Sequence, residues 1–218
     1  EIADGVVFQT EDAKKYFNAK IQKKGCVIPN PISSNLMSPY QGVRKKKIVN
    51  FCRLNKQKNI PLLISAFEEF CNIHPDYELH IYGDGAEKET ILDIIYSKHL
   101  ERIIKVFPNT PNVHELVINA AMFVSTSDFE GLSNSMLEAL SMGLPTICTD
   151  CPCGGARMVI EDGVNGFLIP VNNQKSLVDK MLLIAGSSEL TIKLSNNALK
   201  INNKLNVDNI CKQWISLL

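Results

Sequence analysis

The sequence has no excess of charge of either sign, because 23 Lys and Arg residues balance 23 Asp and Glu residues. A molecule without a net field is not drawn as a whole to nucleic acid or to an acidic membrane, so we expect no nucleic-acid partner. No stretch approaches the roughly 18 uninterrupted apolar residues of a membrane-spanning helix. Residues 1–4 lack the basic region and apolar core of a signal peptide, and we therefore expect a cytoplasmic protein.

Motifs for metal-bound phosphate are missing as well. There is no Asp-x-Asp pair to hold magnesium and no Gly-x-x-x-x-Gly-Lys-Ser/Thr loop.

The seven cysteines are an odd number, and reduced thiols fit a cytoplasmic protein. Cys148, Cys151 and Cys153 have metal-like spacing but no second cluster or nearby histidine, which favours incidental thiols over a metal site. Five cysteines stand among apolar neighbours, where we expect them to pack as small hydrophobes: Cys26, Cys52, Cys71, Cys148 and Cys211.

Short apolar runs alternate with helix-like segments through most of the chain. Such alternation predicts a parallel, doubly wound α/β sheet with right-handed crossovers. The expected strands are residues 26–28, 48–53, 77–82, 103–107, 121–124, 145–149 and 167–169, and the expected helices are 10–17, 60–73, 87–99, 113–119, 133–140, 156–160, 173–185, 188–202 and 207–218. Ligands of such sheets bind at the carboxyl ends of the strands, so we expect the site on that rim.

The stretch 129–140 is the centre of the pattern, because a buried strand ends there and a helix begins. Gly131 is expected to let the backbone turn tightly, and Ser133 is expected to cap the helix. The free N–H groups of a helix start favour an anion such as phosphate. Glu130 would lie at the mouth of the crevice, whereas Glu138 lies farther into the helix and could accept hydrogen bonds from a ribose diol. The alternative is a capping carboxylate and a solvated helix residue.

Two cations follow the strand at residues 48–53. Arg53 and Lys58 are five positions apart, close enough for both side chains to reach one diphosphate, although a surface arginine and lysine at a helix start remain the alternative. The run 44–47 is expected to be a solvated strand entry rather than an anion patch. Gly83-Asp84-Gly85 is a weak dinucleotide fingerprint, since Lys88 replaces the third glycine. The Gly83-Asp84-Gly85 segment either lets the backbone pass close to a nucleotide or makes a simple tight turn.

Five motifs occur in a familiar order. They are Arg53-Leu54-x-x-x-Lys58-Asn59, Ile81-Tyr82-Gly83-Asp84-Gly85, Glu130-Gly131 with Leu137-Glu138-Ala139, Gly143-Leu144-Pro145, and Asn165-Gly166-Phe167-Leu168-Ile169-Pro170. From about Val6 to the carboxyl terminus the chain resembles the carboxyl-terminal, donor-binding half of the enzymes of glycosyltransferase family 4 (group 1). These are retaining enzymes with two Rossmann-like domains, an arrangement called the GT-B fold. Phe51-Cys52 in place of a glycine, and Met158 in place of a frequent glutamate, depart from the family pattern.

The resemblance implies a role for each motif. Arg53 and Lys58 would bind the donor diphosphate, Glu138 the ribose, and Glu130 would act as the catalytic residue beside the donor sugar. Backbone N–H groups would face the phosphates at Leu132, Ser133 and Asn134, and base or loop contacts would come from Gly83, Asp84, Gly85, Phe107, Pro108 and Asn109. The implied donor is a nucleotide-diphosphate sugar, with UDP and a hexosyl group expected, and neither a metal nor a cofactor is implied.

The resemblance also implies a division of the chain. Residues 1–42 would be the end of an acceptor-binding domain and a linker, residues 43–205 the donor-binding domain, and residues 206–218, with Trp214, a helix that crosses back. The acceptor would be a glycan or a lipid-linked molecule held by the other domain, with peripheral membrane association possible for the whole enzyme. The chain alone is expected to have negligible transferase activity. The alternatives are a non-catalytic nucleotide-sugar-binding module and an oxidoreductase, which the broken glycine fingerprint disfavours.

Overall fold

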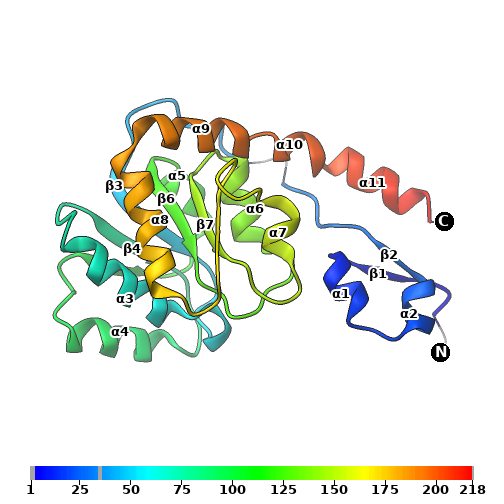
Figure 1. Cartoon of the computed structure of the whole chain (residues 1–218), viewed down its shortest axis with the longest axis horizontal. Helices are drawn as coiled ribbons and strands as arrows, with labels where there is room; N and C mark the ends of the chain where they lie inside the picture. Colours follow the sequence, from blue (N-terminus) through cyan, green and yellow to red (C-terminus); the bar gives the residue numbers. More distant parts are fainter. Residues whose placement is uncertain (1–2, 34–35, 218) are drawn as a thin grey trace.

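The computed structural model describes residues 3–33 and 36–217. Its main body is a parallel sheet of six strands in the order β5-β4-β3-β6-β7-β8. Figure 1 shows the central strands β3 and β6 of this sheet with helices around them. The strands are β3 (Lys45–Phe51), β4 (Glu78–Tyr82), β5 (Ile104–Phe107), β6 (Ala120–Ser125), β7 (Thr146–Thr149) and β8 (Phe167–Ile169). This order confirms the predicted doubly wound parallel sheet.

The strand order reverses between β3 and β6. From β3 the chain moves outward through β4 to β5, and it then returns to place β6 on the other side of β3. The two central strands pair directly, with Ile48 opposite Met122 and Val49 opposite Phe123. The loops that leave β3 and β6 run to opposite faces of the sheet, so a crevice opens between them at the carboxyl ends of these strands.

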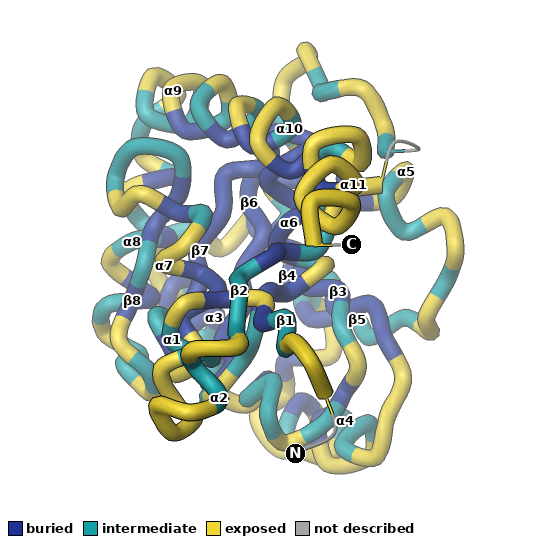
Figure 2. Tube along the Cα trace, turned by 90° about the vertical axis from the view of Figure 1, so that its right-hand side faces the viewer, coloured by how far each residue is buried: buried dark blue, intermediate teal, exposed yellow. Residues whose placement is uncertain are grey.

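Helices cover both faces of the sheet. They are α3 (Ile60–Cys71), α4 (Lys88–Ser97), α5 (Val113–Val117), α6 (Asn134–Ser141), α7 (Gly155–Val159), α8 (Gln174–Gly186), α9 (Ser188–Ala198), α10 (Ile201–Lys204) and α11 (Val207–Ile215), with a 3-10 turn η1 at Lys56–Lys58. Ile48 belongs to one buried cluster with α3, α4 and α8, and its neighbour Val49 belongs to another with α6 and α10. Successive side chains of a strand point to opposite faces, which explains the division. Figure 2 shows the central strands as buried.

Helix α3 shows why these segments fold as they do. Its apolar residues recur at helical spacing, so Leu63, Phe67 and Phe70 are fully buried against the sheet. The three side chains share one stripe of the helix. Packing of this stripe, more than intrinsic helix propensity, stabilises a helix of twelve residues.

The amino-terminal segment lies beside the six-stranded sheet (Figure 1). It comprises β1 (Val6–Phe8), α1 (Glu11–Lys15), α2 (Ala19–Lys23) and β2 (Gly25–Val27), and the two strands pair in parallel. The helix predicted for residues 10–17 is therefore shorter, and a second helix follows it. Helix α2 lacks an apolar periodicity, but Asn18 caps it by accepting hydrogen bonds from the N–H groups of Lys20 and Ile21.

Two further predictions need correction. The helix expected at residues 188–202 is divided into α9 and α10. In the run 44–47, Lys45 and Lys46 are exposed as predicted. Arg44 is not a solvated residue, because its guanidinium donates hydrogen bonds to three backbone carbonyls. The acceptors are Ile118, Ala120 and Gly143, at 3.2, 3.0 and 2.7 Å. Burial lowers the pKa of Arg44. Through its hydrogen bonds, Arg44 joins the start of β3 to the loops around β6 and β7.

None of the helices in residues 3–33 and 36–217 combines the length and hydropathy that crossing a bilayer requires.

Candidate functional site

Two cavities of about 460 and about 330 Å³ lie at the carboxyl ends of β3 and β6 and share part of their lining. The shared residues are Phe51, Cys52, Arg53 and Ser135, so we treat the pair as one feature, the switch-point cleft. The larger cavity is also lined by Gln9, Asn30, Asn55, Gln57, Lys58, Glu130, Leu132, Ser133 and Asn134, and the smaller one by Tyr82, Asp84, Asn109, Val113 and Glu138. The cleft occupies the predicted rim, at the point where the strand order reverses.

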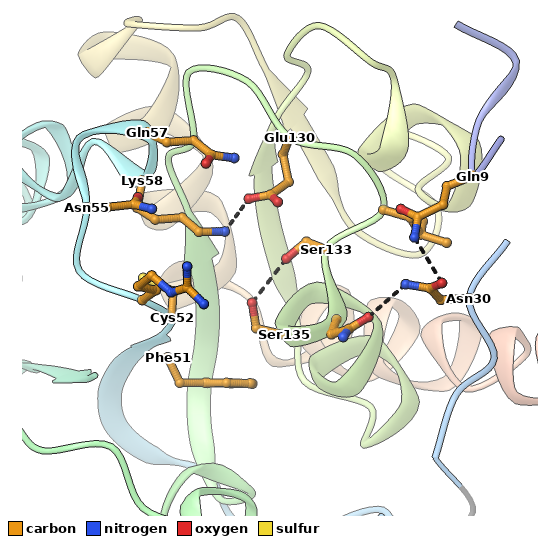
Figure 3. Close-up of a pocket in the computed structure, with 13 residues that line it drawn as sticks. Gln9, Asn30, Phe51, Cys52, Asn55, Gln57, Lys58, Glu130, Ser133 and Ser135 are labelled. Atoms are coloured by element: carbon orange, nitrogen blue, oxygen red, sulfur yellow. Dashed lines mark hydrogen bonds and ion pairs between the residues drawn. The ribbon is translucent and has the colours of Figure 1, made fainter. Parts of the chain in front are cut away.

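An ion pair crosses the larger cavity. The Nζ atom of Lys58 contacts Oε2 of Glu130 (Figure 3). The hydroxyl of Ser127 donates a hydrogen bond to the same oxygen at 3.3 Å. The side chains of Lys58 and Glu130 are only 13% and 22% exposed. Partial burial strengthens the attraction between opposite charges and makes either charge costly without its partner. The structure thus brings the predicted cation and the predicted catalytic carboxylate into direct contact.

Backbone and amide contacts fix the two loops that carry this pair. The N–H of Asp128 donates to the carbonyl of Gln57 at 2.9 Å, and the Gln57 amide donates to the carbonyl of Phe129 at 2.7 Å. Asn59, with φ of 46° in the left-handed region that asparagine tolerates, donates to the Asp128 carboxylate at 2.7 Å. The loops are therefore joined on both sides of Lys58, and these contacts hold Lys58 and Glu130 in place.

Arg53 differs from Lys58 in its surroundings. It is exposed, it lines both cavities, and no ion pair of its guanidinium is found within residues 3–33 and 36–217. Both cations border the larger cavity. Arg53 is available to an incoming anion, whereas Lys58 is already paired with Glu130.

The start of α6 forms another wall of the larger cavity. Ser133 occupies the N-cap position, but its hydroxyl lies 3.1 Å from that of Ser135 and makes no capping hydrogen bond, so the predicted side-chain cap is wrong. The first N–H groups of a helix have no intrahelical partner, and without a capping side chain they are open to an anion. Asn134 accepts a hydrogen bond from Asn30, which accepts one from Gln9, at 3.3 and 3.0 Å.

Gln9 and Asn30 are cleft residues that the sequence did not reveal. They follow β1 and β2, and Figure 3 shows them on the side of the cavity opposite Lys58. No motif marks them, because single amides in a turn-rich stretch have no distinctive spacing.

A close backbone contact positions the Glu130 turn. A Cβ added to Gly155 would lie 1.8 Å from the carbonyl oxygen of Gly131, so α7 can approach the turn only with glycine at this position. The chain bends at Gly131 as predicted, but Gly131 has no positive φ, so this bend does not use the left-handed region that favours glycine. Gly154, with φ of 67°, precedes α7 as its N-cap.

The smaller cavity holds Glu138, Asp84 and Asn109. Asp84 accepts hydrogen bonds from Lys88 Nζ and from the N–H of Asn109, each at 2.8 Å, and these contacts hold the pKa of the Asp84 carboxyl below its usual range. Oε2 of Glu138 lies 3.1 Å from Nε2 of His114. Sequence reasoning missed His114, since a lone histidine in a short helix gives no signal.

The other predicted base or loop contacts line neither cavity. A Cβ added to Gly83 would lie 2.0 Å from the carbonyl oxygen of Cys52, and one added to Gly85 would lie 2.1 Å from that of Leu54. These glycines let two loops of the chain approach each other. Phe107 stacks on Tyr82 with centroids 4.9 Å apart, and Pro108 is exposed.

The thiols vary in their burial. Burial raises the pKa of Cys52 to about 12 although the residue borders both cavities. Cys148 and Cys151 are buried and Cys153 is exposed, and no group of three His, Cys, Asp or Glu residues in the described ranges is placed to hold a metal. Cys211, expected among apolar neighbours, is exposed on α11.

The strand order and the cleft place the chain among Rossmann-like α/β proteins that bind ligands at a topological switch point. Residues 40–201 match the family model described as Glycosyl transferases group 1, and the chain belongs to this family. Its six-stranded sheet matches the corresponding part of GT-B glycosyltransferase structures.

Similar proteins include the poly(ribitol-phosphate) alpha-N-acetylglucosaminyltransferase of Staphylococcus aureus, which is 30% identical over 174 residues, covering 79% of this chain and 35% of that protein. A variant of S. aureus TarM in complex with fondaparinux, alpha-GlcNAc-glycerol and UDP has a TM-score of 0.89 and 27% identity, over 98% of this chain and 43% of that one. HepE of Anabaena in complex with UDP shares the fold, with a TM-score of 0.88 and 22% identity, over 99% of this chain and 63% of that one. The chain therefore spans less than two thirds of the length of each.

Proposed function

We propose that the chain forms the carboxyl-terminal, donor-binding half of a retaining GT-B glycosyltransferase of family 4. The observation that carries the proposal is the convergence of Arg53, Lys58, Glu130, Glu138 and the start of α6 on one cleft at the switch point. These residues come from the segment that follows β3 and from the loop and helix α6 that follow β6, on either side of the reversal in strand order. Their charges suit a ligand that has an anionic centre and a polyol on either side of it.

The donor in this proposal is a nucleotide-diphosphate sugar, with UDP and a hexosyl group preferred. The UDP in the TarM variant and HepE complexes supports that choice. The diphosphate lies against Arg53, Lys58 and the N–H groups of Leu132, Ser133 and Asn134. Glu138 accepts hydrogen bonds from the ribose, and the base lies toward Asp84 and Asn109.

In the transfer, the bond between the anomeric carbon and the diphosphate oxygen breaks, and its electron pair leaves with the nucleotide. The acceptor hydroxyl oxygen bonds to the same face of that carbon and gives its proton to the departing phosphate. Two cations and a helix start stabilise the charge that develops on the phosphate, so the proposal requires no metal ion. The Glu130 carboxylate stabilises positive charge on the sugar ring.

The acceptor in this proposal is a glycan or a lipid-linked molecule bound by a domain outside residues 1–218. The whole enzyme is cytoplasmic, at the membrane surface where its acceptor is lipid-linked.

A thermal-shift panel of UDP, GDP, ADP and their sugars tests the donor on this chain. A UDP-sugar is expected to raise the melting temperature most. For the whole protein, NMR of the product tests retention, with an α-linked product expected from an α-linked donor. Binding of a nucleotide sugar with neither transfer nor hydrolysis would favour the non-catalytic binding module, and an inverted product would exclude retention.

A further inference from the structure

His114 makes a contact that links two walls of the smaller cavity. It lies on α5, whose first residue Val113 lines the cavity, and its Nε2 atom is 3.1 Å from Oε2 of Glu138 on α6. The two side chains are 24% and 29% exposed, so both are partly withdrawn from water. A contact of this kind restrains the carboxylate on which it acts.

The imidazole is itself supported by an aromatic neighbour. The rings of His114 and Phe51 meet edge to face, with centroids 6.3 Å apart and planes at 82°. Phe51 ends β3, is 6% exposed, and packs on Phe123 at 4.9 Å. The edge-to-face arrangement is a preferred geometry of π systems and limits rotation of the histidine ring. The support for His114 thus comes from the central strands of the sheet.

The contact leaves part of the Glu138 carboxylate available. A carboxylate has two oxygens with about four acceptor positions, of which His114 occupies one. The Oε1 atom has no hydrogen-bond partner within the part of the chain that the structure describes. Because the terminal torsion of a glutamate is broad, a free carboxylate samples many orientations, and one fixed oxygen sets the direction of the other.

We propose that His114 is a positioning residue that holds the Glu138 carboxylate in the orientation that accepts hydrogen bonds from a ribose diol. The inference rests on the proposed function, in which Glu138 binds the ribose of the donor. His114 acts through Glu138. Loss of the histidine leaves the carboxylate in place but free to rotate. Only the part of the nucleotide affinity that comes from the ribose hydroxyls is then expected to be lost.

Calorimetric titration of UDP and of 2′,3′-dideoxyuridine diphosphate tests this dependence. The parent chain is expected to bind UDP more tightly than the dideoxy compound. His114→Leu removes the donor and is expected to weaken UDP binding about tenfold, with no change for the dideoxy compound. His114→Gln keeps an amide donor of similar reach and is expected to restore most of the affinity. His114→Asn, which is too short to reach, behaves as His114→Leu and replaces it if the leucine variant does not fold.

His74→Leu is the matched control, because His74 is also half-buried but packs between Phe70 and Tyr77 and lines neither cavity. It is expected to leave both affinities unchanged. An equal loss for both ligands in the His114 variants would show a merely structural role and overturn this inference alone. Equal binding of both ligands by the parent would overturn the ribose assignment to Glu138 and this inference with it.

Discussion

The ammonium of Lys58 contacts the carboxylate of Glu130, although 72 positions separate the two residues in the chain. The contact joins the loops that follow β3 and β6, the two strands between which the order of the sheet reverses. The Glu130 carboxylate therefore compensates the charge of one of the two cations of the cleft. An incoming diphosphate meets an unpaired Arg53 and a Lys58 that it must share with Glu130.

Arg53 and Lys58 are expected to differ in their effect on folding. Arg53→Ala should leave the free energy of unfolding unchanged, because the side chain is exposed and outside any ion pair in the described residues. Lys58→Ala should lower it by about 1 to 2 kcal/mol, because the half-buried Glu130 loses its partner. Both should weaken UDP binding by about 2 kcal/mol. Urea unfolding and calorimetry measure the two quantities.

Arg102→Ala supplies the control for an exposed arginine outside the cleft and should change neither quantity. Equal destabilisation by Arg53→Ala and Lys58→Ala would contradict the distinction between the two cations.

The two glutamates are expected to affect different kinetic constants of the whole enzyme. Glu130→Gln keeps the shape of the side chain but removes the charge beside the reacting sugar, so kcat should fall about a hundredfold while UDP affinity changes little. Glu138→Ala loses a contact that donor and transition state share, and should mainly raise KM. Steady-state kinetics separates the two effects, and the assignment fails if the two variants give the same pattern.

The approach of α7 to the Glu130 turn is expected to depend on glycine. Gly155→Ala should destabilise the fold by about 2 to 4 kcal/mol, because its Cβ would overlap the carbonyl of Gly131 and displace the turn. Gly186→Ala is the control, since nothing lies within 4 Å of an added Cβ at the end of α8, and it should be neutral or stabilise by about 0.5 kcal/mol. Thermal unfolding of both variants gives the comparison. If Gly155→Ala left the thermal stability unchanged, the close contact between Gly155 and Gly131 would not be what holds the turn.

Asp84 is expected to make the junction of two cleft loops sensitive to acid. Its hydrogen bonds from Lys88 and from the N–H of Asn109 hold the pKa of its carboxyl below the usual value of an unfolded aspartate, about 3.9. The stabilising contribution is therefore fully present above that value and is lost as the pH falls through the lower pKa of the folded state. Urea unfolding of the parent and of Asp84→Asn should show a constant difference from pH 7 to about 5 that shrinks below about 4. A difference that grew on acidification would refute the assignment.

The sequence predicted the alternating architecture because the apolar pattern of each buried strand and helix is local. Residues such as Leu63, Phe67 and Phe70 indicate their helix by spacing alone. The rim followed from the rule for parallel sheets, which places Arg53, Lys58, Glu130 and Glu138 on the same edge.

Contacts between distant segments could not be predicted in this way. The role of Arg44 depends on three carbonyls more than 70 positions away, and the need for glycine at Gly155 depends on the backbone of Gly131. His114 lacks a motif, so only the fold reveals its contact with Glu138. Ser133 was expected to cap α6 from residue type, but its hydroxyl lies against Ser135 instead.

Calorimetric titration of uridine, UMP and UDP into the parent chain and into Arg53→Ala tests the central claim most directly, because the cleft is proposed to recognise a nucleoside through its diphosphate. Affinity for the parent should rise with each phosphate and fall at higher salt, and Arg53→Ala should lose most of the gain between uridine and UDP. Equal affinities of the parent for uridine and UDP, or an undiminished gain in the variant, would contradict the account.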